Sequence, residues 1–291
     1  MVVQQDGRSA GSAHPLRSAR RAAAVAAALA GVVAGAAGCG GGARAGERGS
    51  DPVEAVRDAP DRLVREGGSR ARTSMQMASG GTRVTIRGAG SYDYRAGLGR
   101  LQVRLPQDAA GAQEHRPITE LLAPGALYMK NRGAGVPADK WVRLDTASLN
   151  DGNLVTGGAT DPLVAAELLR GARGVTYVGR SDVAGVATRH YRGRVDLAAA
   201  ARAASAGNRK ALAAAVKGFG SAPVPFDVYL DDAGLIRKIT HRFRFAEQQA
   251  PGQPKKDVDV ASTTLFYGFG RPAEVELPDK KDIYAGKVAE R

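Results

Sequence analysis

Side chains able to perform acid–base or nucleophilic chemistry are few and scattered in this sequence. The four histidines, His14, His115, His190 and His241, lie far apart along the chain. A lone histidine within a strand is usually structural, although two of these could still converge in space. Asp231 and Asp232 are adjacent carboxylates, but the segment 231–234 (DDAG) has the composition of a turn, where Asp is favoured for backbone reasons. The sequence therefore predicts no catalytic residue.

Motifs that would indicate a cofactor, a metal or an enzyme are also absent from the sequence. It contains no G-x-S-x-G elbow, no H-E-x-x-H, no P-loop and no strand-linked G-x-G-x-x-G. The single cysteine, Cys39, excludes an intramolecular disulfide and a cysteine-based metal cluster. We expect no cofactor, no bound metal and no enzymatic activity.

Cys39 directly follows a segment with the composition of an export signal. Residues 1–21 are polar and basic, whereas residues 22–38 carry no charge and consist mainly of Ala, Gly and Val. A basic region, then an apolar region and small residues, is typical of a signal peptide. The apolar run is short for a permanent transmembrane helix, which needs about 20 residues.

The residues Ala36-Ala37-Gly38-Cys39 resemble a bacterial lipobox, in which the cysteine receives a diacylglyceryl thioether and becomes the new N-terminus. Ala36 departs from the leucine that is commonest there. We expect residues 1–38 to be a lipoprotein signal peptide, Cys39 the lipid attachment site and residues 39–50 a flexible tether. Two acyl chains give stable anchoring, which places the protein on the outer face of the cell membrane.

Two other readings of this N-terminal segment stay open. The chain could be cleaved after an alanine and secreted, or the segment could remain as an uncleaved anchor. The adjacent Arg20 and Arg21 also leave the export route undecided between the general secretory and the twin-arginine pathways.

The net charge of +13 falls to +10 without residues 1–38, which hold four arginines and one aspartate. This charge favours anionic surfaces, either lipid headgroups or nucleic acid. Nucleic acid is not expected, because aromatic interleaving and known nucleic-acid-binding motifs are missing. The remaining chain is long enough for one monomeric domain, residues 51–285, with its own core.

Apolar residues alternate with polar ones through most of that domain, which is typical of antiparallel strands with one solvent-exposed face. In residues 82–94, the even positions include Val84, Ile86, Tyr92 and Tyr94. Further strands are expected at 70–78, 101–105, 117–122, 126–130, 140–144, 175–179, 187–195, 226–230, 235–245 and 257–267.

Helices are expected at three places between these strands. Asp51-Pro52 starts the first helix, which should run toward Arg65 with an interruption at Pro60. Asp161-Pro162 starts the second, which should stop at Gly171. Asp196 begins an alanine-rich stretch to about residue 217, broken near 207–208. The predicted fold class is α+β, a large antiparallel sheet with inserted helices.

Four segments occur in an order that resembles the actinobacterial LppX/LprG lipoprotein family, itself similar to the LolA and LolB carriers. The resemblance covers approximately residues 51 to 280 and rests on the segments 140–144 (KWVRL), 183–191 (VAGVATRHY), 226–238 (FDVYLDDAGLIRK) and 267–275 (YGFGRPAEV). It implies a half-barrel, in which helices cover the concave face of a strongly curved antiparallel sheet. It also implies a non-catalytic protein that binds or carries a lipid or acylated glycolipid in an apolar cavity.

The alternation marks residues for the inner face of such a sheet, as ordinary core or as cavity wall. Tyr128 and Trp141 could lie at the mouth, because an amphipathic ring suits a boundary. The alternative function is a structural or protein-interaction lipoprotein of the cell envelope without lipid cargo. The candidate cavity-lining residues are Val84, Ile86, Leu101, Val103, Phe226, Val228 and Leu230.

Overall fold

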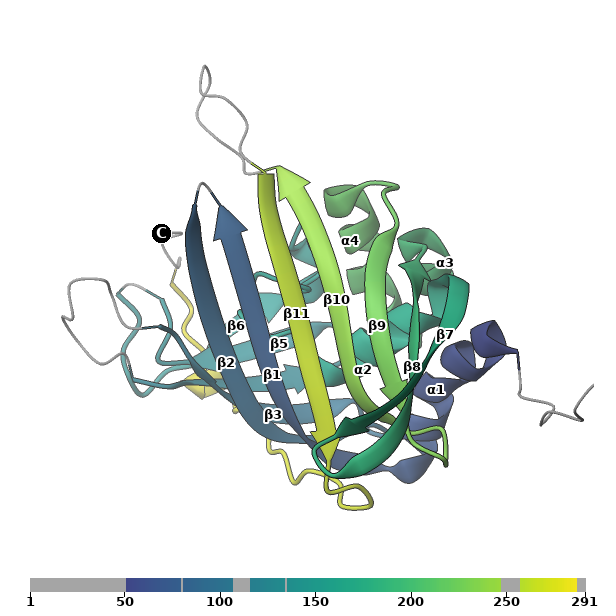
Figure 1. The fold of residues 1–291 in the computed structure, drawn as a ribbon. Helices are drawn as coiled ribbons and strands as arrows, with labels where there is room; N and C mark the ends of the chain where they lie inside the picture. The colour runs from purple at the N-terminus through teal and green to yellow at the C-terminus, as the bar shows by residue number, and fades with distance from the viewer. Residues whose placement is uncertain (1–50, 80, 107–115, 134, 247–256, 287–291) are drawn as a thin grey trace, which may run out of the picture. The chain divides into compact units, whose positions relative to one another are not determined.

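The computed structural model describes residues 51–79, 81–106, 116–133, 135–246 and 257–286 (Figure 1). The described residues all belong to one compact unit. The expected signal peptide, Cys39 and the tether lie outside the described residues, as do His14 and His115.

The eleven strands of the described residues belong to one antiparallel sheet with the order β6-β5-β4-β3-β2-β1-β11-β10-β9-β8-β7. Neighbours in the sheet follow the chain, except that β1 pairs with β11 in the middle. The two edge strands, β6 and β7, do not pair with each other, so the sheet stays open. Their bounds are β1 Gly68–Ser79, β2 Thr82–Asp93, β3 Leu98–Arg104, β4 Ile118–Ala123, β5 Ala126–Lys130, β6 Val142–Asp145, β7 Ala172–Val183, β8 Val186–Val195, β9 Val224–Leu230, β10 Ile236–Ala246 and β11 Asp257–Tyr267.

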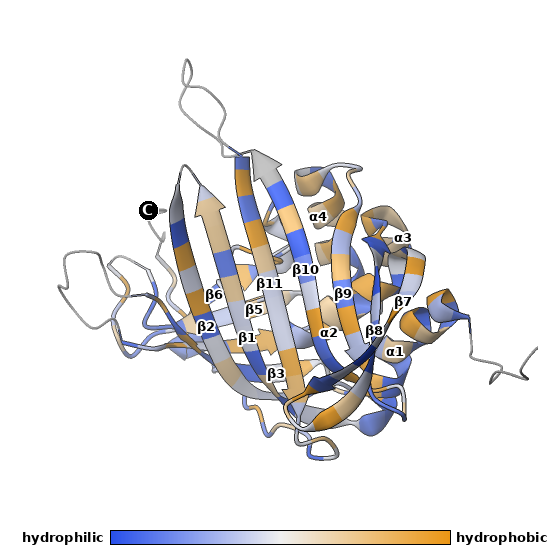
Figure 2. Cartoon of the chain, viewed as in Figure 1, coloured by the Kyte–Doolittle hydropathy of each residue, from blue (hydrophilic) through white to orange (hydrophobic). Residues whose placement is uncertain are grey.

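The strands confirm the period-two pattern of the sequence. In β11, buried and outward residues alternate from Val258 to Phe266, and Figure 2 shows the same alternation of hydropathy along the central strands. The expected turn at 231–234 joins β9 to β10, and Gly234 takes a positive φ of 77° there, which glycine adopts without steric cost. β7 is longer than expected and carries two register shifts against β8.

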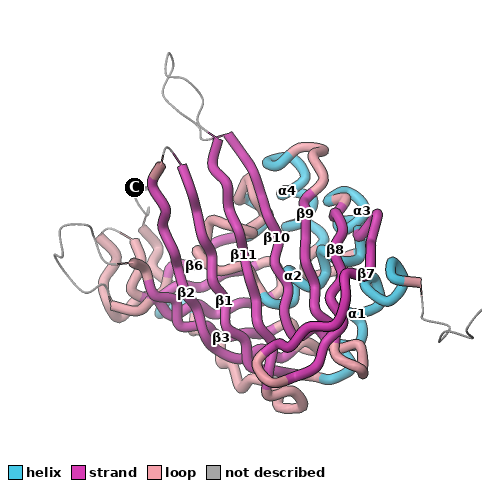
Figure 3. The backbone as a smooth tube through the Cα atoms, viewed as in Figure 1, coloured by secondary structure: helices cyan, strands magenta, loops and turns pink. Residues whose placement is uncertain are grey.

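Helices cover the concave face of the sheet, lying behind β9 and β10 in the view of Figures 1 and 3. The half-barrel that the sequence resemblance implies is therefore confirmed. Among the described residues, no helix is both long and apolar enough to cross a membrane. The helices are α1 Pro52–Glu66, α2 Pro162–Glu167, α3 Leu197–Ala203 and α4 Arg209–Phe219, with 3-10 turns η1 Thr146–Ser148, η2 Leu168–Gly171 and η3 Lys280–Asp282.

Helix α1 corrects one expectation, because it is not interrupted at Pro60. Asp51 caps its N-terminus by accepting a hydrogen bond from the Val53 amide, and one helix continues to Glu66. Pro60 is buried with Val56, Ala59 and Leu63. We attribute the continuity to this packing, which outweighs the loss of one backbone hydrogen bond at the proline.

The other two helix starts agree with the sequence. The Asp161 side chain caps α2 through the amides of Leu163 and Val164. The alanine-rich stretch is split into α3 and α4 at residues 204–208. Short side chains make up much of the buried part of the helical layer, including Ala165, Ala166, Ala200 and Ala215.

A close approach within the sheet explains why residue 99 is glycine. The ring of Tyr92 on β2 lies over Gly99, its partner on β3. A Cβ at this position would collide with the Tyr92 ring. Glycine here therefore leaves room for a buried tyrosine on the concave face.

We predict that Gly99→Ala destabilises the domain, because Tyr92 must move or the strands must separate. The expected loss is about 1–3 kcal/mol, typical of overpacking, and thermal or denaturant unfolding measures it. Ala89→Ser, at an exposed position of β2, serves as the control and should unfold like the wild type. Equal stability of both variants would contradict the contact.

Candidate functional site

The predicted cavity-lining residues all point to the side of the sheet that the helices cover. They join one hydrophobic cluster with residues of α1, α2, α3 and α4. Only Val84 is partly exposed, and the other six are buried. They form two groups, separated by β1, β11 and β10: Val84, Ile86, Leu101 and Val103 on β2 and β3, and Phe226, Val228 and Leu230 on β9.

The first group lies beneath the loop that leads into α2. Gly158 in this loop is close enough to Ile86 and Val103 that a Cβ on it would be in van der Waals contact with both side chains. The Thr160 hydroxyl, two residues later, lies 2.7 Å from the hydroxyl of Ser262 on β11. The loop is thus held against the sheet by apolar packing and one side-chain hydrogen bond.

The middle of the concave face is more polar than the alternation alone suggests. Thr73 on β1 and Thr264 on β11 are direct cross-strand partners and are both buried. His241 on β10 is 1% exposed, and burial lowers its pKa to about 3, so it is neutral. Within the described part of the chain, the Thr73 and Thr264 hydroxyls and His241 Nε2 have no hydrogen-bond partner. These polar atoms therefore lie among buried apolar side chains of the same three strands, such as Met75, Val260 and Phe243.

Glu120 on β4 is the most unusual residue of this face. It is 0% exposed and sits between Leu101 on β3 and Met129 on β5. Neither carboxyl oxygen has a hydrogen-bond partner among the described residues. Burial raises its pKa to about 8, partly offset by Arg132 and reinforced by Asp161. Near neutral pH the side chain is therefore mainly a protonated acid inside the core.

Asp161 links the helical layer to the sheet at the start of α2. Besides capping α2, its carboxylate accepts a hydrogen bond of 3.0 Å from the Tyr92 hydroxyl on β2. Burial raises the pKa of Asp161 to about 6, against the lowering effect of hydrogen bonds from Val164, Tyr92 and Leu163. The Asp161 side chain therefore both caps α2 and attaches it to the sheet.

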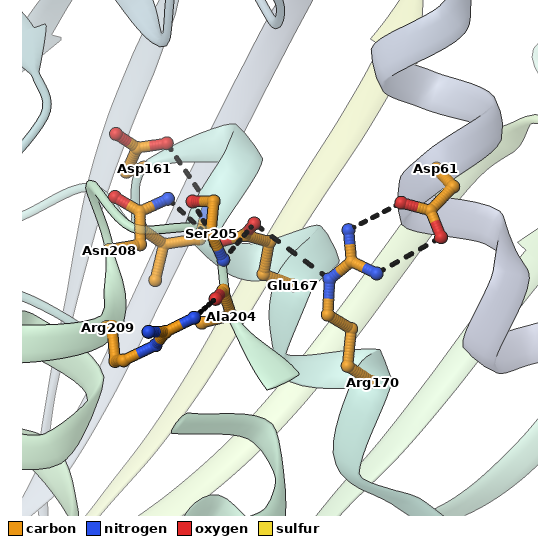
Figure 4. Close-up of polar contacts among 9 residues, drawn as sticks. Asp61, Asp161, Glu167, Arg170, Ala204, Ser205, Asn208 and Arg209 are labelled. Carbon is orange, nitrogen blue, oxygen red and sulfur yellow. Dashed lines mark hydrogen bonds and ion pairs between the residues drawn. The ribbon is translucent and has the colours of Figure 1, made fainter. Parts of the chain in front are cut away.

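Glu167 at the end of α2 binds the connection between α3 and α4 (Figure 4). Its carboxylate accepts hydrogen bonds from the Ser205 amide at 3.0 Å, the Ser205 hydroxyl at 3.2 Å and the Asn208 side-chain amide at 2.9 Å. Buried carboxylates are stable only when paired or hydrogen-bonded, and these bonds supply that stabilisation. Glu167 therefore fixes α2 relative to α3 and α4.

Arg170 in η2 extends this network to α1. Its guanidinium makes two hydrogen bonds to the Asp61 carboxylate, at 2.7 and 3.2 Å, and lies 3.9 Å from Glu167. The hydrogen bond from Arg170 holds the pKa of Asp61 below its usual value. Figure 4 shows the resulting chain of contacts from α1 through η2 to the start of α4.

Two pockets of moderate size lie at the periphery. One of about 290 Å³ is lined by Leu105, Ile118 and Val136 together with Arg116, Asn131 and Arg132. The other, of about 250 Å³, lies where the β7–β8 turn approaches Arg72, Leu265 and Tyr267. A gap of only about 10 Å³ is found between α2, α4 and the β4–β5 turn. The described structure thus has little free volume at that point of the helix–sheet junction.

The remaining candidates serve structural contacts. Tyr128 and Trp141 are half-buried on the β5–β6 side, where Arg143 and Lys130 lie over their rings. His190 lies on the opposite face from His241 and bonds Asp227 at 2.7 Å. Asp231 accepts hydrogen bonds from the Leu235 amide and from Arg237. Among the described residues, no group of three or more His, Cys, Asp or Glu could hold a metal ion.

Sequence reasoning missed the buried carboxylates, although one of them carried a signal. Glu120 shares its strand face with Ile118 and Leu122, so the alternation of β4 places it inside. Asp161 was identified only as a helix cap. Glu167 follows an apolar run and has no local signal, because its partners come from the α3–α4 connection.

The elevated pKa of Glu120 predicts a specific pH dependence. Its folded-state pKa of about 8 lies above the usual 4.5, so the folded protein keeps a proton that the unfolded chain loses. Stability from this group is complete below pH 4.5 and is lost as pH rises to 8. Glu120→Gln, which cannot ionise, should match the wild type near pH 4.5 and be more stable at pH 8 by on the order of 3 kcal/mol.

Unfolding free energies across this pH range, compared between variant and wild type, measure the effect. The exposed Glu274→Gln is the control and should show no such pH-dependent difference. His241 contributes equally to all three proteins and cancels. A constant difference between Glu120→Gln and the wild type at every pH would contradict the buried, protonated state.

Comparison with known proteins gives structural neighbours only. No protein-family model and no curated protein sequence matches the chain. The Mycobacterium tuberculosis lipoprotein LppX is similar with a TM-score of 0.40 and 11% identity, over 78% of this chain and 100% of LppX. LprF from Mycobacterium bovis gives 0.37 and 12%, over 78% and 96%. A LolA superfamily protein from Nitrosomonas europaea gives 0.33 and 10%, over 81% and 98%. The LppX and LolA groups, which the sequence segments resemble, are thus among the chain's structural neighbours.

Proposed function

We propose that this protein is an extracytoplasmic lipoprotein, anchored to the outer face of the cell membrane through Cys39. Its domain would hold acyl chains of a lipid or acylated glycolipid between the concave sheet and the helices, without catalysing a reaction on them. The lipobox-like sequence ending at Cys39 supports the anchor. Residues 1–38 would be removed, and residues 39–50 would be the tether.

The observation that carries the proposal is the open sheet with helices in its concavity. A sheet whose edge strands do not pair can admit a ligand without breaking a ladder of backbone hydrogen bonds. Apolar side chains at both ends of the concave face would contact the acyl chain once the helices move aside. Of the candidates for this wall, Val103 and Val228 are both 0% exposed.

Such a carrier would save the free energy that it costs to expose an acyl chain to water. Moving an acyl chain from a membrane into an apolar cavity replaces one apolar environment by another. Passing it through water costs about 0.8 kcal/mol for each methylene group. A tethered domain with an openable apolar interior therefore lowers the barrier for lipid movement, and no catalytic group is needed.

The helical layer must separate from the sheet for this to happen, which breaks its apolar contacts with the sheet and two side-chain hydrogen bonds at the start of α2. The hydrogen bonds Thr160–Ser262 and Asp161–Tyr92 join the start of α2 to the sheet. The Glu167 network lies within the helical layer and would move with it. We infer that α2, α3 and α4 act together as the cover of the site.

The packed interior of the described structure favours a second candidate as well. The chain's own side chains bury six of the seven candidate wall residues. A protein that never opens would be an envelope lipoprotein with a structural or protein-interaction role. The lipid-uptake experiment below separates the two.

Acylation of Cys39 predicts the behaviour of a single variant. Cys39→Ser should accumulate as an unprocessed precursor or appear in the medium, because the thioether cannot form. Membrane fractionation and mass spectrometry of the N-terminus measure this, with Ser50→Ala as a processed control. Wild-type protein that is fully soluble and carries a maleimide-reactive Cys39 would contradict the anchor.

Locking the cover to the sheet should block lipid uptake. The Thr160 and Ser262 hydroxyls are 2.7 Å apart, so Thr160→Cys and Ser262→Cys can form a disulfide if the Cβ atoms lie within about 4.5 Å. In a Cys39→Ser background, the oxidised protein should lose most binding of a fluorescent phospholipid, and reduction should restore it.

The reduced double variant is its own control for any effect of the substitutions. Mass spectrometry and thiol titration confirm that the disulfide has formed. Undiminished binding by the oxidised protein would exclude entry between these layers. Absence of binding by the wild type would leave the interaction role as the better account.

A further inference from the structure

Arginines that have no carboxylate partner among the described residues gather on the outward face of three adjacent strands. They alternate with the buried residues and are all exposed. Among the described residues, none forms an ion pair, and only Arg72 makes a ring contact, with Tyr267. These six residues, here called the arginine face, are Arg70 and Arg72 on β1, Arg83 and Arg87 on β2, and Arg100 and Arg104 on β3.

The strand register places some of these charges side by side. Arg87 is the direct cross-strand partner of Arg104. Ser91 lies between Arg70 and Arg100, pairing with both. Like charges directly opposite one another destabilise a sheet. The fold alone therefore gives no reason for this arrangement.

The outward face of a nearby strand shows how the same charge is neutralised elsewhere. On β10, Arg237, Arg242 and Arg244 each contact a carboxylate at 2.6 to 2.7 Å. Burial opposes ionisation of one of these partners, Asp227, but hydrogen bonds from Arg242, His190 and Arg192 outweigh it and lower its pKa. Other strands also carry arginines without a carboxylate partner among the described residues, for example Arg180 on β7 and Arg194 on β8, but β1, β2 and β3 hold six of them on one outward face.

We propose that the arginine face is a docking surface for an anionic lipid bilayer. Neighbouring strands lie about 4.8 Å apart, so the six guanidiniums cover an area that meets several lipid headgroups at once. The outward residues of these strands contain no aromatic side chain, on which single-stranded nucleic acid would stack. A wide sheet face also does not fit a DNA groove, which admits a helix or a two-stranded ribbon.

The inference goes beyond the proposed function, because it uses neither Cys39 nor the interior of the domain. It assigns an orientation, with β1, β2 and β3 toward the membrane. Charged contacts of this kind attract the protein over about a Debye length, roughly 10 Å at 0.1 M salt. They would hold the domain at the surface in a defined pose.

The test compares two double variants of the full chain that lose equal charge. Arg87→Gln/Arg104→Gln removes the directly opposed pair. Arg180→Gln/Arg194→Gln removes two exposed arginines on β7 and β8 that also have no carboxylate partner in the described residues. The probe is sedimentation with phosphatidylcholine vesicles, pure or containing about one-third phosphatidylglycerol, at about 20 and 150 mM salt.

We expect the arginine-face variant to lose binding to the anionic vesicles by about fivefold per arginine at low salt, and the control variant to lose much less. Binding to neutral vesicles should be equal in all three proteins, because any apolar anchor contributes the same to each. The arginine-face variant should melt at or above the wild-type temperature, since a repulsive pair is removed.

Equal losses in both variants would mean that net charge alone governs binding and would overturn the proposal. So would unchanged binding of the arginine-face variant, or tighter binding to a DNA duplex than to the anionic vesicles. Each of these results would leave the lipid-uptake proposal standing, because that depends on the opposite face of the sheet.

Discussion

An antiparallel sheet of eleven strands keeps one face dry only if something fills its concavity, and here the helical layer does so. The strands supply the apolar rows, but their curvature leaves a hollow that the sheet cannot close by itself, because β6 and β7 do not meet. Alanine-rich helices and the loop before α2 occupy that hollow. The burial of this face is the largest favourable contribution available to the domain.

The attachment of the cover depends on polar groups that are costly to bury. Asp161 and Glu167 are compensated by hydrogen bonds, whereas Glu120 is compensated by keeping its proton. A purely apolar interior would fix the orientation of the helices less well, because the hydrophobic effect is not directional. The polar contacts therefore specify where α2, α3 and α4 lie on the sheet, while the apolar contacts provide most of the stability.

The local elements were predictable from the sequence because they follow local periodicity and capping. The strand 257–267 and the helix starts at Asp51 and Asp161 agree with the structure, and the half-barrel agrees with the sequence resemblance. The interruption expected at Pro60 was wrong, because the packing of α1 outweighs the local effect of the proline. The pairing of β1 with β11 could not be read from the residues, because partners distant along the chain leave no local pattern.

The candidate site, too, was predictable from the sequence only where it depends on local patterns. Alternation placed Val103 and Val228 on the inner face, but it could not show that Thr73, Thr264 and His241 lie between the two apolar groups. Nor could it show which arginines would face carboxylates. Those properties arise from strand order, so a single sequence constrains which face a residue occupies more than which neighbours it meets.

The pairing of β1 with β11 also sets the order in which the domain can fold. The first and last strands of the sheet meet at its centre, so the strands that precede β11 can form at most two partial sheets, β1 to β6 and β7 to β10. Joining them requires contacts between the two ends of the domain, and such long-range contacts slow folding. A chain emerging from a membrane pore would leave the β1 and β10 edges unpaired until its final strand arrives. Open strand edges of this kind can pair with other chains and make a folding intermediate prone to aggregate.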